Sequence, residues 1–108
     1  MTARRLSRLP RHRILQTEVP VACGWRSRLL GLSLLEREQA GPGLLIPRCA
    51  SVHTFGMRFE LDLYFLDPSG RPLAVRRAVR SRRVVGHRGA VAVLELPAAG
   101  GESSPAPA

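Results

Sequence analysis

Apolar residues alternate with polar ones through most of the chain, and the longest such stretch is residues 58–79. Every second residue of its first half is apolar and therefore shares one face of a strand: Phe59, Leu61, Leu63 and Phe65. The tetrapeptide DPSG at 67–70 has Asp, Pro and Gly where a type I turn favours them. The chain then returns with three apolar residues expected on one face: Leu73, Val75 and Val79. This pattern predicts a β-hairpin.

Three shorter segments also have the pattern of strands. They cover residues 13–19, 41–47 and 90–96, and turn-forming Gly or Pro residues lie beside them. Residues 24–32 differ, because Trp25, Leu29 and Leu32 recur at i, i+4 and i+7, which predicts one short helix with an apolar stripe. Gly31 is placed to cap its end. Together these elements predict a mainly β fold, a small antiparallel β-sandwich or barrel with one short N-terminal helix.

The two ends of the chain differ in composition from its body. Residues 1–11 are basic and predict a flexible arm, whereas residues 98–108 are rich in Ala, Pro, Gly and Ser and predict a disordered tail. Residues 12–97 then form a single domain. The basic N-terminus lacks the apolar segment of a signal peptide, and no apolar stretch approaches the ~20 residues of a membrane helix. We therefore expect a cytoplasmic location and no membrane partner.

Positive charge is concentrated in one segment of the body. All 17 basic residues are Arg, the net charge is +9, and residues 71–88 contain seven Arg and no acid. Phosphate contacts from this segment give an alternative function, the binding of nucleic acid or of an acidic partner, through Arg76, Arg77, Arg80, Arg82, Arg83 and Arg88. The segment lacks an aromatic residue to stack on bases. A solvated strand face in a protein with high-GC coding bias is the favoured interpretation.

Four sequence blocks occur in a recognisable order: WRSRLLGL, GLLI, SVHTFGMRFELDLYFLD with its turn, and AVAVLELPAAG. This series resembles the bacterial and archaeal family known as domain of unknown function 192, over residues 22–100. The matching positions include Arg28 and Gly31 in the first block, His53 in the third and Glu95 in the last. Ser33 departs from the family pattern, in which Met often follows Gly-Leu. The resemblance implies a compact β fold with short helices. It does not imply an activity.

Polar residues within these blocks form the candidate site. Tyr64 and Leu66 share the face of Asp62, so we expect this carboxylate to be partly buried and to need a cation or several donors. Arg28 and His53 are its expected partners, either as a structural latch or as part of a ligand site. We expect a small domain that binds a small polar or anionic ligand, or a partner, through Arg28, His53, Thr54, Met57, Asp62 and Glu95.

Catalytic and metal chemistry have weaker support. His53 as a general acid or base is a second alternative, but the sequence has no G-x-S-x-G turn to present a nucleophile. Cys49 and His53 would lie about 13 Å apart in an extended strand, too far to share one zinc ion. The two cysteines form no C-x-x-C motif and no disulfide framework. We therefore expect no cofactor and no metal, and favour a protein without enzymatic activity.

Overall fold

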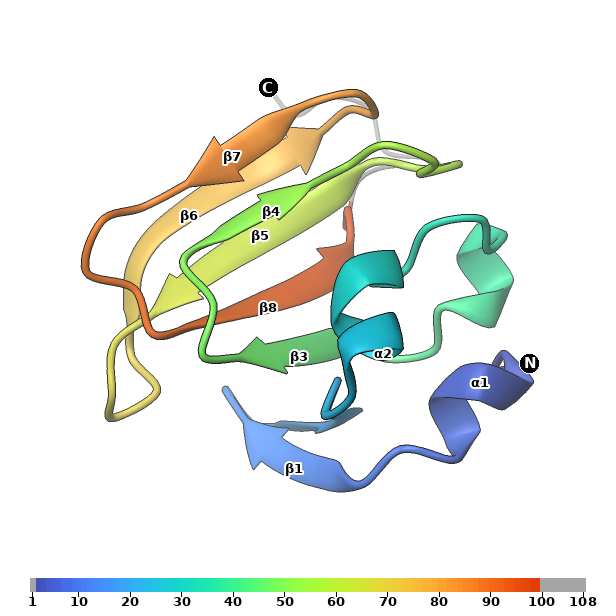
Figure 1. Cartoon of the computed structure of the whole chain (residues 1–108), viewed down its shortest axis with the longest axis horizontal. Coiled ribbons are helices and arrows are strands. Elements are labelled where there is room, and N and C mark those ends of the chain that lie inside the picture. The colour runs from blue at the N-terminus through green and yellow to red at the C-terminus, as the bar shows by residue number, and fades with distance from the viewer. Residues whose placement is uncertain (1, 100–108) are drawn as a thin grey trace.

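A four-stranded antiparallel sheet forms the centre of the fold (Figure 1). The computed structural model describes residues 2–99 of the chain. The strands of the central sheet follow the order β3 (Leu44–Pro47), β8 (Ala92–Pro97), β5 (Leu61–Leu66) and β6 (Pro72–Val79). Two antiparallel ribbons accompany it, namely β1 (Arg11–Ile14) with β2 (Thr17–Pro20), and β4 (Ser51–His53) with β7 (Val84–Gly86). The helical elements are α1 (Arg4–Ser7), α2 (Trp25–Leu30) and the 3₁₀ helix η1 (Arg37–Gln39).

Different elements cover the two faces of this sheet. On one face, Leu63 and Phe65 belong to the same apolar cluster as Val52 of β4 and Val85 of β7. Figure 1 shows the β4–β7 ribbon and α2 on this side. On the other face, the apolar cluster includes Val19 of β2. The predicted mainly β, antiparallel fold is confirmed, but among the described residues the sheet does not close into a barrel.

The predicted hairpin is present, with a β-bulge in its second strand. The β5–β6 register shifts beside Asp62, so that both Arg77 and Ala78 lie opposite this one residue. Ala78 has a φ of +52°, a left-handed conformation that non-glycine residues rarely adopt. An extra residue reverses the alternation of side chains. Val75 and Val79 therefore point to opposite faces, and the expectation that they share one face is wrong.

Asp62 holds this bulge. Its Oδ1 atom accepts a hydrogen bond from the backbone N–H of Ala78 at 2.8 Å, and its Oδ2 atom lies 3.2 Å from the Arg77 guanidinium. That guanidinium also lies over the ring of Tyr64, 5.6 Å from its centroid. The carboxylate is buried, as expected, but Arg28 and His53 are not its partners. Asp62 contributes to the shape of β6.

The N-terminal third differs most from the sequence-based expectations. Residues 13–19 do not form one strand, because Leu15 and Gln16 adopt positive φ angles of 49° and 66° and turn the chain between β1 and β2. The segment expected as a flexible arm, residues 1–11, contains α1, whose Leu6 side chain lies in the core. The tail expected over residues 98–108 falls outside the described residues beyond residue 99. No helix of the described chain is long and apolar enough to cross a membrane.

We expect Asp62→Ala to lower the free energy of unfolding by about 2 kcal/mol, because the Ala78 N–H loses a charged acceptor. Asp62→Asn keeps one oxygen for this bond and should lose about half as much. Chemical denaturation measures both. Arg76→Ala, an exposed change in the same strand, should stay within about 0.5 kcal/mol of the parent. An Asp62→Ala variant as stable as Arg76→Ala would contradict this account.

Candidate functional site

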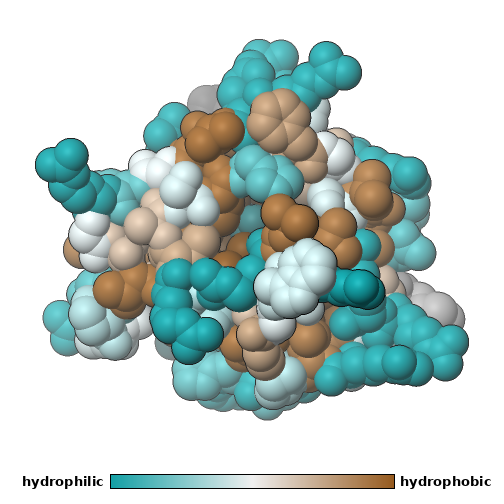
Figure 2. All heavy atoms as spheres, in the orientation of Figure 1, coloured by the Kyte–Doolittle hydropathy of each residue, from teal (hydrophilic) through white to brown (hydrophobic). Residues whose placement is uncertain are grey.

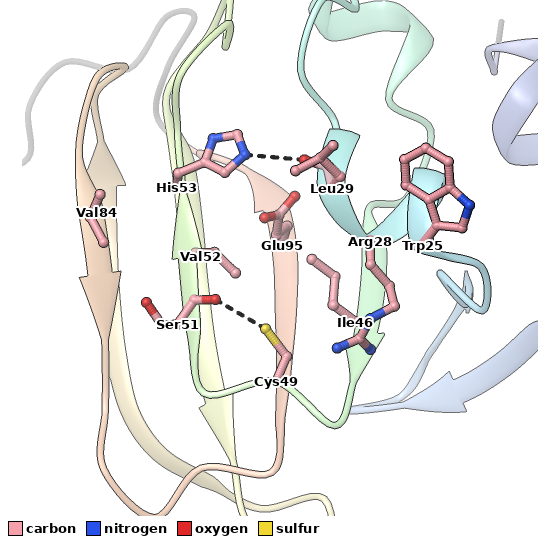
Figure 3. A pocket seen from close by; sticks show the side chains of 10 residues that line it. All are labelled: Trp25, Arg28, Leu29, Ile46, Cys49, Ser51, Val52, His53, Val84 and Glu95. Carbon is pink, nitrogen blue, oxygen red and sulfur yellow. Dashed lines mark hydrogen bonds between the residues drawn. The ribbon is translucent and has the colours of Figure 1, made fainter.

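A pocket opens between α2 and β4 on the face of the sheet that carries the β4–β7 ribbon (Figure 3). Its volume is about 570 Å³, which is within the range of small-molecule sites. Side chains from α2, β3, β4, β7, β8 and the loop before β4 line it: Trp25, Arg28, Leu29, Ile46, Cys49, Ser51, Val52, His53, Val84 and Glu95. Three of the six candidate site residues are in this group, namely Arg28, His53 and Glu95.

Glu95 places a buried carboxyl in this pocket. It lies on β8 opposite Leu63 of β5, so its side chain points to the face that carries α2. The residue is 2% exposed, and Oε1 has no hydrogen-bond partner among the described residues. Burial raises the pKa of Glu95 to about 7, and a hydrogen bond from the backbone N–H of Leu32 acts in the opposite direction. One carboxyl oxygen at the wall of the pocket is therefore buried without a hydrogen-bond partner among the described residues.

Gly31 allows the carboxyl to approach the end of α2. It has a φ of +54°, and a Cβ atom at this position would lie 2.9 Å from Oε1 of Glu95. A side chain here would thus be strained and would also press on the carboxyl. Arg5 of α1 donates hydrogen bonds to the carbonyls of Gly31 and Ser33, at 3.1 and 2.6 Å. Part of the predicted flexible arm therefore supports the turn beside Glu95.

His53 connects the two walls of the pocket. Its Nε2 atom lies 3.1 Å from the carbonyl oxygen of Leu29 in α2, and its Nδ1 atom accepts a hydrogen bond from the backbone N–H of Phe55 at 3.2 Å. These two bonds fit the neutral imidazole with its proton on Nε2. His53 is the last residue of β4, and the loop that follows it leads to β5.

Arg28 fastens α2 to the end of β3. Its guanidinium donates hydrogen bonds to the carbonyl oxygens of Pro47 and of Arg48, the latter at 2.9 Å. Two of its donor groups are thus engaged with backbone. The Arg28 side chain also lines the pocket (Figure 3).

The rim of the pocket is apolar and open. Trp25 and Leu29 are 70% and 58% exposed, and Val84 is 71% exposed. Figure 2 shows apolar side chains among hydrophilic ones on the face that carries α2 and β4. A helix is present within the predicted residues 24–32, with Gly31 as its C-cap, but α1 and η1 are additional to the one helix expected. Two residues of the apolar stripe of α2 line the pocket mouth and are not buried in the core.

The other three candidate residues lie away from the pocket. Thr54 is buried, and its hydroxyl donates to the carbonyl of Arg80 at 2.7 Å and accepts from the N–H of Arg83 at 2.8 Å. These two hydrogen bonds connect the end of β4 to the loop before β7. Met57 belongs to the apolar core, and Asp62 points to the opposite face of the sheet. The structure thus brings together one half of the predicted site.

Three of the seven pocket residues that were not among the candidates come from two short strands whose pairing the sequence did not predict. Ser51 and Val52 belong to β4, and Val84 belongs to β7. The β4–β7 ribbon joins residues more than 30 positions apart, with His53 opposite Val84. A three-residue strand has too short a pattern to be recognised from alternation. The run VHTF offered a polar motif but no signal for this pairing.

The six arginines of the alternative nucleic-acid site lie on β6 and on the loops on either side of β7, and all are exposed. Arg77 among them pairs with Asp62. Binding of nucleic acid through these residues stays a prediction. No group of three or more potential metal ligands occurs among the described residues. Both Cys23 and Cys49 are free thiols.

The family model described as DUF192, an uncharacterized conserved family, matches residues 8–103. The chain belongs to the DUF192 family. A crystal structure of a protein of unknown function from Novosphingobium aromaticivorans DSM 12444 resembles this DUF192 chain with a TM-score of 0.60 and 19% sequence identity. The match covers 74% of this chain and 62% of that protein, and at this identity it shows a shared fold alone. None of the curated proteins matches the chain.

We expect Glu95 to give the protein a distinctive pH dependence of stability. The folded-state pKa of about 7 exceeds the ordinary value of 4.5, so the folded chain holds this proton more tightly. The stability from Glu95 is complete below pH 4.5 and is lost as the pH rises through 7. Relative to Glu95→Gln, which does not titrate, the parent should lose about 3 kcal/mol between pH 4.5 and pH 8.

Urea denaturation of both proteins across this pH range measures the difference. Glu60→Gln is the matched control, because Glu60 is exposed and lies outside the pocket. Its difference from the parent should vary little with pH. If the stability difference between the parent and Glu95→Gln varied equally little with pH, the carboxyl of Glu95 would have an ordinary pKa. It would then be better solvated than its position indicates.

Proposed function

We propose that this DUF192 chain is a binding domain whose pocket between α2 and β4 receives a small polar ligand. The observation that carries the proposal is the buried carboxyl of Glu95, of which one oxygen has no hydrogen-bond partner among the described residues. A buried polar atom without a partner is costly. A ligand that donates a hydrogen bond to Oε1 would remove this cost.

The walls around this carboxyl support the same conclusion. Ile46, Val52 and Leu29 provide apolar surface, and Glu95 provides a convergent polar group. An apolar cavity with few polar groups is the usual composition of a small-molecule site. The polar group fixes the orientation of the ligand, and the apolar walls contribute affinity by removing its surface from water.

Binding fits the state of His53 better than acid–base catalysis does. Both ring nitrogens already have backbone partners, the Leu29 carbonyl and the Phe55 N–H. A general base needs a free nitrogen within reach of the substrate proton. His53 in this proposal sets the distance between β4 and α2 and thereby the width of the pocket.

Cys49 provides a test, because its side chain lines the pocket while Cys23 lies outside it. We expect members of a small fragment library to shift the backbone amide NMR signals of residues 29–32 and 51–53. In a Cys23→Ser variant, alkylation of Cys49 with N-ethylmaleimide should abolish these shifts, because the added group fills the pocket.

The matched control is a Cys49→Ser variant alkylated at Cys23, in which the fragments should still bind. Fragment shifts that survive alkylation of Cys49 would place the ligand elsewhere. The absence of any fragment that perturbs the pocket residues in the parent chain would remove the proposal.

A further inference from the structure

Few charged groups are available to a ligand in the pocket. The charged or titratable groups that face it are Arg28 from α2, Cys49 from the loop before β4, His53 from β4 and Glu95 from β8. Strands β3 and β7 contribute apolar Ile46 and Val84. The guanidinium of Arg28 is engaged with the carbonyls of Pro47 and Arg48. Glu95 is the charged group of the pocket with a buried polar atom, Oε1, that has no hydrogen-bond partner among the described residues.

This distribution disfavours an anionic ligand. An anion in the pocket would face the Glu95 carboxyl, and Arg28 already donates hydrogen bonds to two backbone carbonyls. A like charge opposite a buried carboxylate is unfavourable. The anionic branch of the sequence-based expectation is thus the less favourable one.

We propose that the pocket selects a primary amine on a small apolar body, with the ammonium group donating to Oε1 of Glu95. The inference rests on the proposed function and names the chemical class of its ligand. An ammonium supplies both a donor and the opposite charge, whereas an alcohol or amide supplies a donor alone. The apolar body would lie against Ile46, Val52 and Leu29.

The environment of Glu95 also provides a second acceptor for such a head group. The carbonyl oxygen of Leu29 has two lone pairs, and the bond from His53 uses one of them. In Figure 3 the Glu95 carboxyl lies beside this hydrogen bond, between β4 and α2. An ammonium has three N–H donors, so it has donors left for a second acceptor after it contacts the carboxylate.

The test compares three probes that share one ring: benzylamine, benzyl alcohol and benzoate. Binding is measured from amide NMR shifts of the parent chain at pH 8 and 150 mM salt, where long-range repulsion from the net charge of +9 is screened. We expect benzylamine to bind at least tenfold more tightly than either other probe. Glu95→Gln should lower benzylamine affinity at least tenfold, and Glu60→Gln should leave it unchanged.

The pH dependence gives a further readout. Between pH 8 and pH 5.5 the amine stays protonated while Glu95 gains a proton, since its pKa is about 7. Benzylamine affinity should therefore fall at least tenfold, and affinity for benzyl alcohol should not follow it. Glu95→Gln should abolish this dependence. A dependence that persists in Glu95→Gln would assign it to a group other than Glu95 and overturn the inference.

The outcomes separate this inference from the proposed function. Benzyl alcohol or benzoate binding in the pocket as tightly as benzylamine would overturn the amine class and leave the pocket a ligand site. Failure of all three probes, together with failure of the fragment library, would remove both proposals. The comparison among probes uses the parent chain, so it stands even if Glu95→Gln folds poorly.

Discussion

The cost of burying a carboxylate in an apolar sheet governs the form of this protein. Asp62 and Glu95 lie on the adjacent strands β5 and β8 and point to opposite faces, and both are almost fully buried. Asp62 has the Ala78 N–H and the Arg77 guanidinium as partners. Glu95 has one backbone N–H as a partner, and its Oε1 atom has none among residues 2–99. The carboxylate of Asp62 is accommodated by the bulge in β6, whereas that of Glu95 is buried at the wall of a pocket.

That cavity depends on how α2 is held. A helix of six residues is unstable by itself, and none of the residues of α2 is buried. Hydrogen bonds hold it instead: Arg28 to the end of β3, His53 to the Leu29 carbonyl and Arg5 to the turn at Gly31. Because these contacts lie at the margins of the helix, its apolar side chains need not close onto the sheet. The space between α2 and β4 thus exists because hydrogen bonds, and not buried apolar side chains, hold the helix in place.

The sequence predicted the mainly β, antiparallel architecture, the hairpin, its turn and the helix α2, because alternation and turn residues are local signals. It did not predict α1 or η1. It did not predict the bulge at Ala78, since one inserted residue leaves no mark in composition, nor the β4–β7 ribbon, whose strands are too short. The error over Asp62 has the same origin. The Ala78 N–H becomes a partner of Asp62 only because of the bulge. Without knowledge of the bulge, the expected partners were the distant cations Arg28 and His53. Arg28, His53 and Glu95 line one pocket, and this shared position depends on tertiary contacts.

The motif around His53 shows why a polar cluster in a sequence is a weak guide to a site. Within HTFGM, the Thr54 hydroxyl is hydrogen-bonded to the loop before β7, and Met57 is buried in the core. His53 is the residue of this motif that lines the pocket. Glu95, in contrast, stands alone in an apolar strand and has the sequence appearance of a strand-end carboxylate. What distinguishes it is an unmet hydrogen bond at a buried atom, a property of the packed chain. A ligand that meets this bond would stabilise the folded state by mass action, and the instability introduced by Glu95 would then be greatest when the pocket is empty.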